Sequence, residues 1–111
     1  MRLAIVGSRG IEVENLEEYL PSGVTEILTG GARGVDRCAV ELAKCLGIPY
    51  REFLPDYRRY GRAAPLKRNE QIVSSAQFTL VFWDGASRGT AHVLSLLKER
   101  AVPYTLVTRT P

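Results

Sequence analysis

The chain has 111 residues, of which 45% are hydrophobic and 24% charged, so residues 1–111 have the size and composition of a single globular domain. No apolar run approaches the roughly 20 residues of a membrane span, and no signal-peptide pattern follows Met1, so we expect no membrane partner. His92 is the only histidine, and no zinc-binding spacing of Cys and His exists, so we expect no metal.

The two cysteines, Cys38 and Cys45, lie seven residues apart in one predicted helix. Seven residues place them roughly 10 Å apart along the helix axis, which is too far for a disulfide. Free cysteines are typical of a reducing compartment, so we expect a cytoplasmic protein.

The formal charge of +3 is unevenly distributed. The segment 56–68 holds five basic residues and one acid, a local charge of +4, which leaves −1 for the remainder of the chain. This concentration indicates a basic site, whereas a protein that coats nucleic acid would be basic over its whole surface.

Apolar runs and helical stripes alternate through the first half of the chain. The run at 2–6 is nearly continuous in apolar residues, which predicts a buried strand of a parallel sheet. Val13, Leu16 and Leu20 form one stripe, which predicts a helix over 13–20. The other expected elements are a strand at 26–29, a helix at 35–46 and a strand at 50–54.

The second half begins with a long connection, 55–65, which is basic and aromatic and is predicted to be a binding loop or lid. After it we expect a helix at 66–76, an apolar strand at 78–83, a helix at 90–100 and an edge strand at 102–108. The last residues are expected to fray.

This alternation predicts an α/β fold, a Rossmann-like three-layer domain with a parallel five-stranded sheet and helices on both faces. The most plausible strand order is 3-2-1-4-5. In that order the first and fourth strands are neighbours at the topological switch point, where such sheets bind ligands outside the carboxyl ends of their strands.

Three predicted strands end in turns that combine an arginine with a glycine, at Ser8-Arg9-Gly10, Ala32-Arg33-Gly34 and Ser87-Arg88-Gly89. The predicted strand order brings all three turns to the carboxyl edge of the sheet. Unpaired backbone N–H groups in such turns and at helix N-termini suit an anion. We therefore predict one shared anionic ligand.

Several side chains in these turns have two interpretations. Arg9, Arg33 and Arg88 could fork onto phosphate oxygens or be surface arginines beside turns. The hydroxyls of Ser8, Ser87 and Thr90 could bind phosphate or cap helices. Asp36 could accept a ribose hydroxyl, or be an acid that is favourable in the first turn of a helix.

Two acids are catalytic candidates only if the chain is an enzyme. Asp84 ends the fourth strand and could act as an acid–base group or hold Arg88 or Arg9 in place. Glu70 could have the same role or be solvated. Other side chains also have structural interpretations. We interpret His92 as a hydrogen-bonded structural group, and Trp83 and Tyr60 could either stack on a base or pack within the protein.

Five ordered motifs together resemble the YspA/YpsA-like branch of the SLOG superfamily: Gly7-Ser8-Arg9, Gly30-Gly31-Ala32-Arg33-Gly34-Val35-Asp36, Tyr60-Gly61-Arg62-Ala63-Ala64, Arg68-Asn69-Glu70 and Asp84-Gly85-Ala86-Ser87-Arg88-Gly89-Thr90-Ala91-His92. The resemblance implies a Rossmann-like domain that binds nucleotides or nucleotide-derived ligands. Together with the turns, it gives the expected ligand-binding residues: Gly7, Ser8, Arg9, Gly30, Gly31, Arg33, Gly34, Asp36, Arg68, Asn69, Gly85, Ser87, Arg88, Gly89 and Thr90.

The resemblance also implies two more distant relatives, because the SLOG superfamily includes the LOG phosphoribohydrolases and the DNA-processing protein A proteins, which bind single-stranded DNA. LOG enzymes carry Pro-Gly-Gly-x-Gly-Thr-x-x-Glu at the fourth turn and cleave an N-glycosidic bond with that glutamate. Here Asp84 replaces the leading proline and Val93 replaces the glutamate, and a valine cannot transfer a proton.

Three interpretations therefore stay open. The first is a nucleotide-binding domain or ligand sensor, and the second is a nucleotide-processing hydrolase that uses Asp84 or Glu70. The third is a single-stranded nucleic-acid-binding module that uses Tyr57, Tyr60, Arg58, Arg59 and Arg62. The helix faces and sheet edge that such a minimal unit exposes favour a homodimer.

Overall fold

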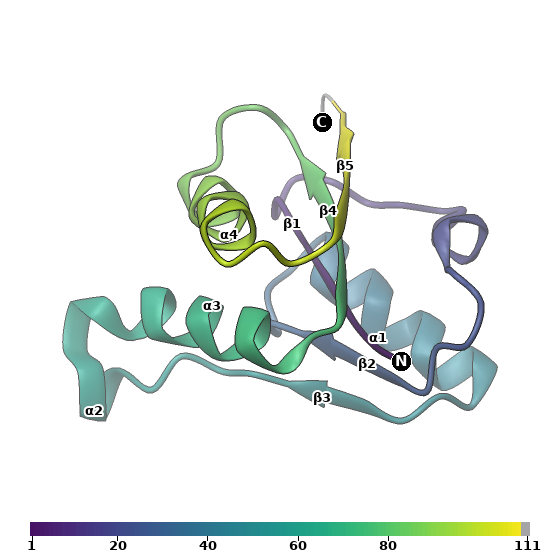
Figure 1. The fold of residues 1–111 in the computed structure, drawn as a ribbon, viewed down its shortest axis with the longest axis horizontal. Coiled ribbons are helices and arrows are strands. Elements are labelled where there is room, and N and C mark those ends of the chain that lie inside the picture. Colours follow the sequence, from purple (N-terminus) through teal and green to yellow (C-terminus); the bar gives the residue numbers. More distant parts are fainter. Residues whose placement is uncertain (110–111) are drawn as a thin grey trace.

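The computed structural model describes residues 1–109, which form a five-stranded, all-parallel sheet in the order β3-β2-β1-β4-β5 (Figure 1). The fold class and strand order predicted from the sequence are confirmed. The strands are β1 (Arg2–Gly7), β2 (Glu26–Thr29), β3 (Tyr50–Glu52), β4 (Phe78–Trp83) and β5 (Tyr104–Thr108). β1 lies at the centre and pairs with β2 and β4, so the first and fourth strands are neighbours as expected.

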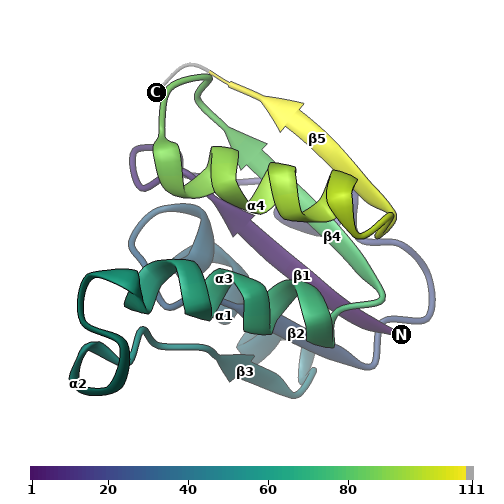
Figure 2. The ribbon, with the colours of Figure 1, turned by 60° about the vertical axis from the view of Figure 1, so that its left-hand side comes forward.

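Helices cover both faces of the sheet. Helices α3 (Ala64–Ser75) and α4 (Arg88–Glu99) lie side by side on one face, and α1 (Val35–Leu46) lies on the other with a short 3-10 turn, η1 (Leu16–Tyr19) (Figure 2). Because side chains alternate along a strand, those of β1 point in turn to the two faces of the sheet. Leu3 and Ile5 pack in the core under α1, while Ala4 and Val6 pack in the core under α3 and α4.

The helix predicted over 13–20 is wrong, because this segment contains only the single turn of η1. Val13 and Leu16 are nevertheless buried, so the apolar spacing was a correct guide to burial but not to conformation. A helix of eight residues is marginal without a good cap, and Asn15 makes no side-chain capping bond to η1. The last turn of η1 contains no basic residue that could pair with the exposed glutamates of this segment.

The long loop predicted at 55–65 is also wrong in part. It contains a short helix, α2 (Tyr57–Tyr60), and a 3-10 turn, η2 (Gly61–Ala63), and α3 then begins at Ala64. Pro65 lies in the first helical turn of α3, where its missing N–H costs no hydrogen bond. No residue of α2 is buried, and α2 stands away from the sheet at one end of the molecule (Figures 1 and 2).

The remaining differences are small. Helix α1 and the strands β2 and β4 match the prediction to the residue, and α1 ends at Gly47, whose φ of 67° gives the left-handed cap. β3 ends two residues earlier than predicted, because its last partner is Thr29 of β2. β5 begins two residues later, opposite Thr79, and α4 begins two residues earlier, after Ser87. The fraying expected at the chain end falls on 110–111, outside the described residues.

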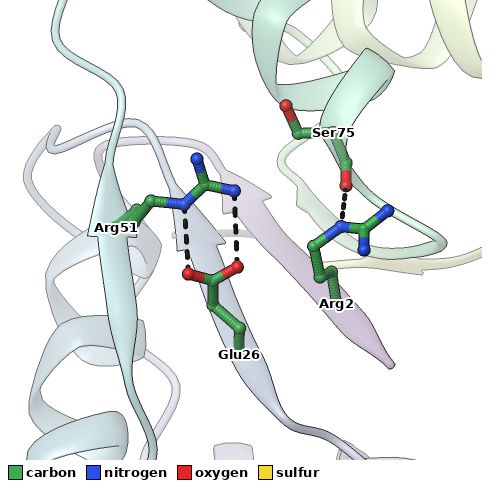
Figure 3. Close-up of polar contacts among 4 residues, drawn as sticks. All are labelled: Arg2, Glu26, Arg51 and Ser75. Atoms are coloured by element: carbon green, nitrogen blue, oxygen red, sulfur yellow. Dashed lines mark hydrogen bonds and ion pairs between the residues drawn. The ribbon is translucent and has the colours of Figure 1, made fainter.

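At the amino edge of the sheet, polar groups bond to one another (Figure 3). Arg51 of β3 donates two hydrogen bonds to the carboxylate of Glu26 on β2, at 3.1 and 3.3 Å. Arg2 Nε donates to the Ser75 carbonyl at 2.6 Å, which joins β1 to the end of α3. Within residues 1–109, none of the helices combines the length and apolarity that a membrane crossing needs.

Candidate functional site

A cavity of about 600 Å³ lies at the carboxyl edge of the sheet, where the turns after β1, β2 and β4 meet. The convergence expected from the strand order is therefore present. Of the residues predicted to bind a ligand, eleven line this cavity: Gly7, Ser8, Arg9, Gly30, Asp36, Arg68, Asn69, Ser87, Arg88, Gly89 and Thr90. The catalytic candidate Asp84 lines it as well.

Ser8 joins the turns after β1 and β4. Its side chain is buried, and its backbone N–H donates to the Phe82 carbonyl at 3.0 Å. The Asp84 N–H donates to the Ser8 hydroxyl oxygen at 3.1 Å, and the Ser8 and Ser87 hydroxyls are hydrogen-bonded at 2.7 Å. Because the backbone and both hydroxyls are tied together, the two turns hold one relative position.

Asp84 stabilises the turn that precedes α4. Its Oδ1 accepts the N–H groups of Ala86 and Ser87, both at 2.8 Å. These two bonds hold the pKa of the Asp84 carboxyl below its ordinary value, and the bond from Ser87 has the larger effect. Asp84 is therefore ionised at neutral pH and has no proton to give. Within the described part of the chain it pairs with neither Arg9 nor Arg88.

The N-terminus of α4 faces the cavity without a side-chain cap. Ser87 precedes this 12-residue helix, but its hydroxyl bonds to Ser8 and makes no capping bond. Gly89 and Thr90, in the first turn, line the cavity. The first N–H groups of a helix have no partner within it and carry the positive end of its dipole. This end of the cavity is therefore suited to an anion.

Asp36 is buried at another wall of the cavity, only 5% exposed. Its Oδ2 accepts the Ala32 N–H at 3.2 Å, while its Oδ1 is buried without a hydrogen-bond partner. Burial raises the pKa of the Asp36 carboxyl, and the Ala32 amide, the Arg68 charge and the amides of Gly7 and Gly30 oppose this shift. The amides of Gly7 and Gly30 thus lie near the carboxylate.

Arg68 lies across Gly30 from Asp36. Its Nη1 donates to the Gly30 carbonyl and, at 3.3 Å, to the Phe53 carbonyl, and its Nε donates to Asn69 Oδ1 at 3.1 Å. Burial lowers the pKa of the guanidinium, and the Asp36 charge raises it. A Cβ on Gly30 would lie 2.8 Å from both Arg68 Nη1 and Asp36 Oδ2, so only glycine lets the two charged side chains come this close.

Five predicted site residues do not line the cavity: Gly31, Arg33, Gly34, Gly85 and Glu70. The glycines instead shape the turns, with φ of 75°, 73° and 84°. A Cβ on Gly34 would lie 2.5 Å from the Arg9 carbonyl oxygen, so this glycine packs one turn against another. Glu70 Oε2 lies 3.6 Å from Lys67 Nζ on the exposed side of α3.

Two aromatic candidates for base stacking, Tyr60 and Trp83, do not line the cavity either. The Trp83 indole donates to the Ser87 carbonyl at 3.0 Å, so it supports the turn before α4. His92 is hydrogen-bonded, as predicted, and its partner, which the sequence did not indicate, is Asn69.

Some lining residues were not singled out as site residues. Arg62 of η2 was expected only as part of the basic segment, and Pro65 and Leu66 were not expected because the start of α3 was misplaced. Gly10 and Ala32 belong to the predicted turns, so they line the cavity with their neighbours. An apolar wall completes the lining: Val6, Ile72 and Val93.

Among residues 1–109, no three His, Cys, Asp or Glu side chains gather closely enough to hold a metal ion. Comparison of the chain with protein-family models, with curated proteins and with solved structures finds no match. The resemblance to the SLOG superfamily therefore stays a prediction.

Proposed function

We propose that this chain binds a nucleotide or nucleotide-derived ligand, with a phosphate group at the N-terminus of α4. The observation that carries the proposal is the cavity of about 600 Å³ where three glycine-containing turns meet an uncapped helix N-terminus. This volume is within the usual range of roughly 300–1,000 Å³ for small-molecule sites. The resemblance of these motifs to the YspA/YpsA-like branch of the SLOG superfamily implies the same ligand class.

The charge and polarity of the lining support an anionic ligand with an apolar part. Four arginines line the cavity, Arg9, Arg62, Arg68 and Arg88, against two aspartates. Arginine matches phosphate oxygens with a planar fork of donors. Opposite these charges, the wall of Val6, Ile72 and Val93 offers an apolar surface of the kind that a base or sugar ring contacts.

The same lining supports binding more than bond cleavage. Asp84 is ionised and bonded to two amides, and Glu70 lies outside the cavity beside Lys67. Val93 stands where LOG enzymes carry their glutamate. None of these three positions offers a proton donor to a glycosidic bond, so we propose a ligand-binding or sensing role.

The α2 segment supports a second candidate, the binding of single-stranded nucleic acid. Tyr57 is 59% exposed, Arg58 and Arg59 are exposed beside it, and the Arg59 guanidinium lies 5.3 Å from the centre of the Tyr60 ring. Aromatic and arginine side chains on a protruding element are suited to stack on bases and contact phosphates. Affinity would then rise with oligonucleotide length and fall steeply with salt.

Thermal unfolding against a panel of mononucleotides, dinucleotides and short oligonucleotides tests the proposal. A ligand at 100 times its dissociation constant should add about 2.7 kcal/mol to the free energy of unfolding. We expect a selective response to one class of small nucleotide, lost in Arg88→Ala. The matched control is Arg37→Ala, because Arg37 is exposed on α1 and pairs with Glu41.

A response to oligonucleotides alone would support the second candidate and overturn the first. Release of free base from a bound nucleotide would replace binding with the hydrolase interpretation. A flat response to the whole panel would remove all three.

A further inference from the structure

A continuous series of hydrogen bonds connects α4 to the wall of the cavity. His92 on α4 bonds to Asn69 on α3, Asn69 bonds to Arg68, and Arg68 bonds to the carbonyl of Gly30 in the turn after β2. Asn69 is only 5% exposed, so water cannot readily replace these partners. His92 does not line the cavity, so any effect it has on a ligand acts through the other residues.

The orientation of the Asn69 amide follows from its partners. Arg68 Nε can only donate, so the Asn69 atom 3.1 Å from it must be the acceptor, Oδ1. The Gly89 carbonyl, 3.4 Å from the other amide atom, can only accept, so that atom must be the donor Nδ2. The two partners independently require the same orientation.

The protonation state of His92 follows in turn. Asn69 Nδ2 lies 3.1 Å from His92 Nδ1 and is a donor, so Nδ1 must be the acceptor. The imidazole is then neutral and carries its hydrogen on Nε2. In this state both hydrogens of Asn69 Nδ2 have acceptors, one on His92 and one on Gly89.

We propose that His92 is a positioning residue for the cavity: as a neutral acceptor it orients Asn69, and Asn69 in turn fixes the guanidinium of Arg68. Three of the five N–H groups of Arg68 are used by Asn69, Gly30 and Phe53, which leaves the two hydrogens of Nη2 for a ligand. The effect on binding rests on the proposed function, whereas the tautomer of His92 does not.

The tautomer can be measured directly, because His92 is the only histidine in the chain. A long-range proton–nitrogen correlation spectrum of the full-length protein at mildly alkaline pH contains one imidazole. We expect a bare, hydrogen-bonded Nδ1 and a protonated Nε2. A protonated Nδ1, or the mixture of tautomers typical of a solvated ring, would overturn the proposal whether or not the chain binds nucleotides.

The positioning effect is tested with inorganic phosphate as the probe, titrated into the wild type and two variants. His92→Phe keeps a flat ring but has no acceptor, and we expect it to weaken phosphate binding about three- to tenfold, the equivalent of one hydrogen bond. His92→Gln retains a carbonyl acceptor and should recover most of the loss. Thermal unfolding without phosphate checks that both variants are folded.

A double-mutant cycle separates positioning from a general structural effect. If His92 acts through Arg68, His92→Phe should cause no further loss of phosphate binding in an Arg68→Lys background. Additive losses would contradict the proposal, as would unchanged binding in His92→Phe. Absence of phosphate and nucleotide binding in the wild type would remove the proposed function, while the tautomer measurement would still decide the hydrogen-bond arrangement.

Discussion

At the amino edge of the sheet, Glu26, Arg51 and Arg2 are hydrogen-bonded within the protein, whereas at the carboxyl edge four arginines and two aspartates line a cavity. Glu26 accepts two hydrogen bonds from Arg51, and Arg2 donates to the end of α3 (Figure 3). At the other edge, Asp36 has a buried oxygen without a partner, and the first turn of α4 has no side-chain cap. Among the described residues, Arg9 pairs with no carboxylate.

The two edges belong to the same parallel strands, so the difference is not a property of the fold. Burying a polar group without a partner costs about 1–3 kcal/mol, and more for a charged group. Proteins retain such costs mainly where a ligand or a reaction uses the groups. The contrast supports the proposal that the ligand binds at the carboxyl edge.

The largest expected effect tests how tightly the carboxyl-edge turns are packed. In Gly34→Ala, the new Cβ would lie 2.5 Å from the Arg9 carbonyl oxygen, at a φ of 73° that alanine rarely adopts. We expect a loss of about 3 kcal/mol in the free energy of unfolding, from backbone strain and the clash. Chemical denaturation measures it.

Gly47→Ala is the matched control. Gly47 ends α1 toward the amino edge with a similar φ of 67°, but a Cβ there would have no atom within 4 Å. Only the conformational cost of about 1 kcal/mol applies. Equal losses in the two variants would show that the contact with the Arg9 turn is unimportant.

Asp36→Asn should stabilise the protein at neutral pH. Burial raises the pKa of Asp36 in the folded chain above its ordinary value of 3.8. Ionisation of the Asp36 carboxyl therefore lowers the free energy of unfolding as the pH rises from 3.8 through the folded-state pKa. Asparagine keeps an acceptor for the Ala32 N–H and avoids this cost. We expect a gain of about 1 kcal/mol at pH 7, which shrinks as pH falls toward 3.8.

Urea denaturation of the wild type and Asp36→Asn across this pH range measures the gain. A variant that is less stable than the wild type at pH 7 would mean that the attraction of Arg68 outweighs burial. The contrast between the two edges would then be weaker.

Gly89→Ala should raise stability and lower ligand binding together. A Cβ on Gly89 would have no atom within 4 Å, and the position is helical, so alanine should add about 0.5–1 kcal/mol. The same methyl group would lie in the first turn of α4, beside the proposed anion site. We expect about tenfold weaker phosphate binding by titration, and unchanged binding would exclude this turn as the anion site.

The smallest effect is expected at the amino edge. Glu26→Gln removes the ion pair with Arg51, in which the two side chains are 25% and 51% exposed. Such pairs contribute about 0.2–1 kcal/mol and weaken with salt. Thermal unfolding should shift slightly, and ligand binding should not change. A loss of binding in this variant would break the separation of the two edges.

The sequence predicted the elements with strong periodicity and clear ends. Helix α1 was found to the residue because its apolar stripe runs from Val35 and Gly47 supplies a left-handed cap. The predicted helix at 13–20 failed because burial of Val13 and Leu16 requires only apolar spacing, which a loop with one turn also provides. Pro65 appeared to end a loop but lies inside the first turn of α3.

The candidate site was predictable where it depends on strand order. Parallel strands bring their carboxyl-terminal turns to one edge, so Ser8, Gly30 and Ser87 were expected together and line one cavity. The partners of Asn69 were not predictable, because they depend on how α3 and α4 pack. Arg62 joins the lining from η2, a turn that the sequence pattern did not predict.

The most direct test is a titration of the isotope-labelled protein with adenosine monophosphate, followed by backbone amide shifts. We predict changes in the amides of Gly30, Gly89 and Thr90 at the carboxyl edge and none in those of Glu26 and Arg51 at the amino edge. Shifts confined to α2, shifts at the amino edge, or no shifts at millimolar nucleotide would contradict the assignment of the carboxyl-edge cavity as the ligand site.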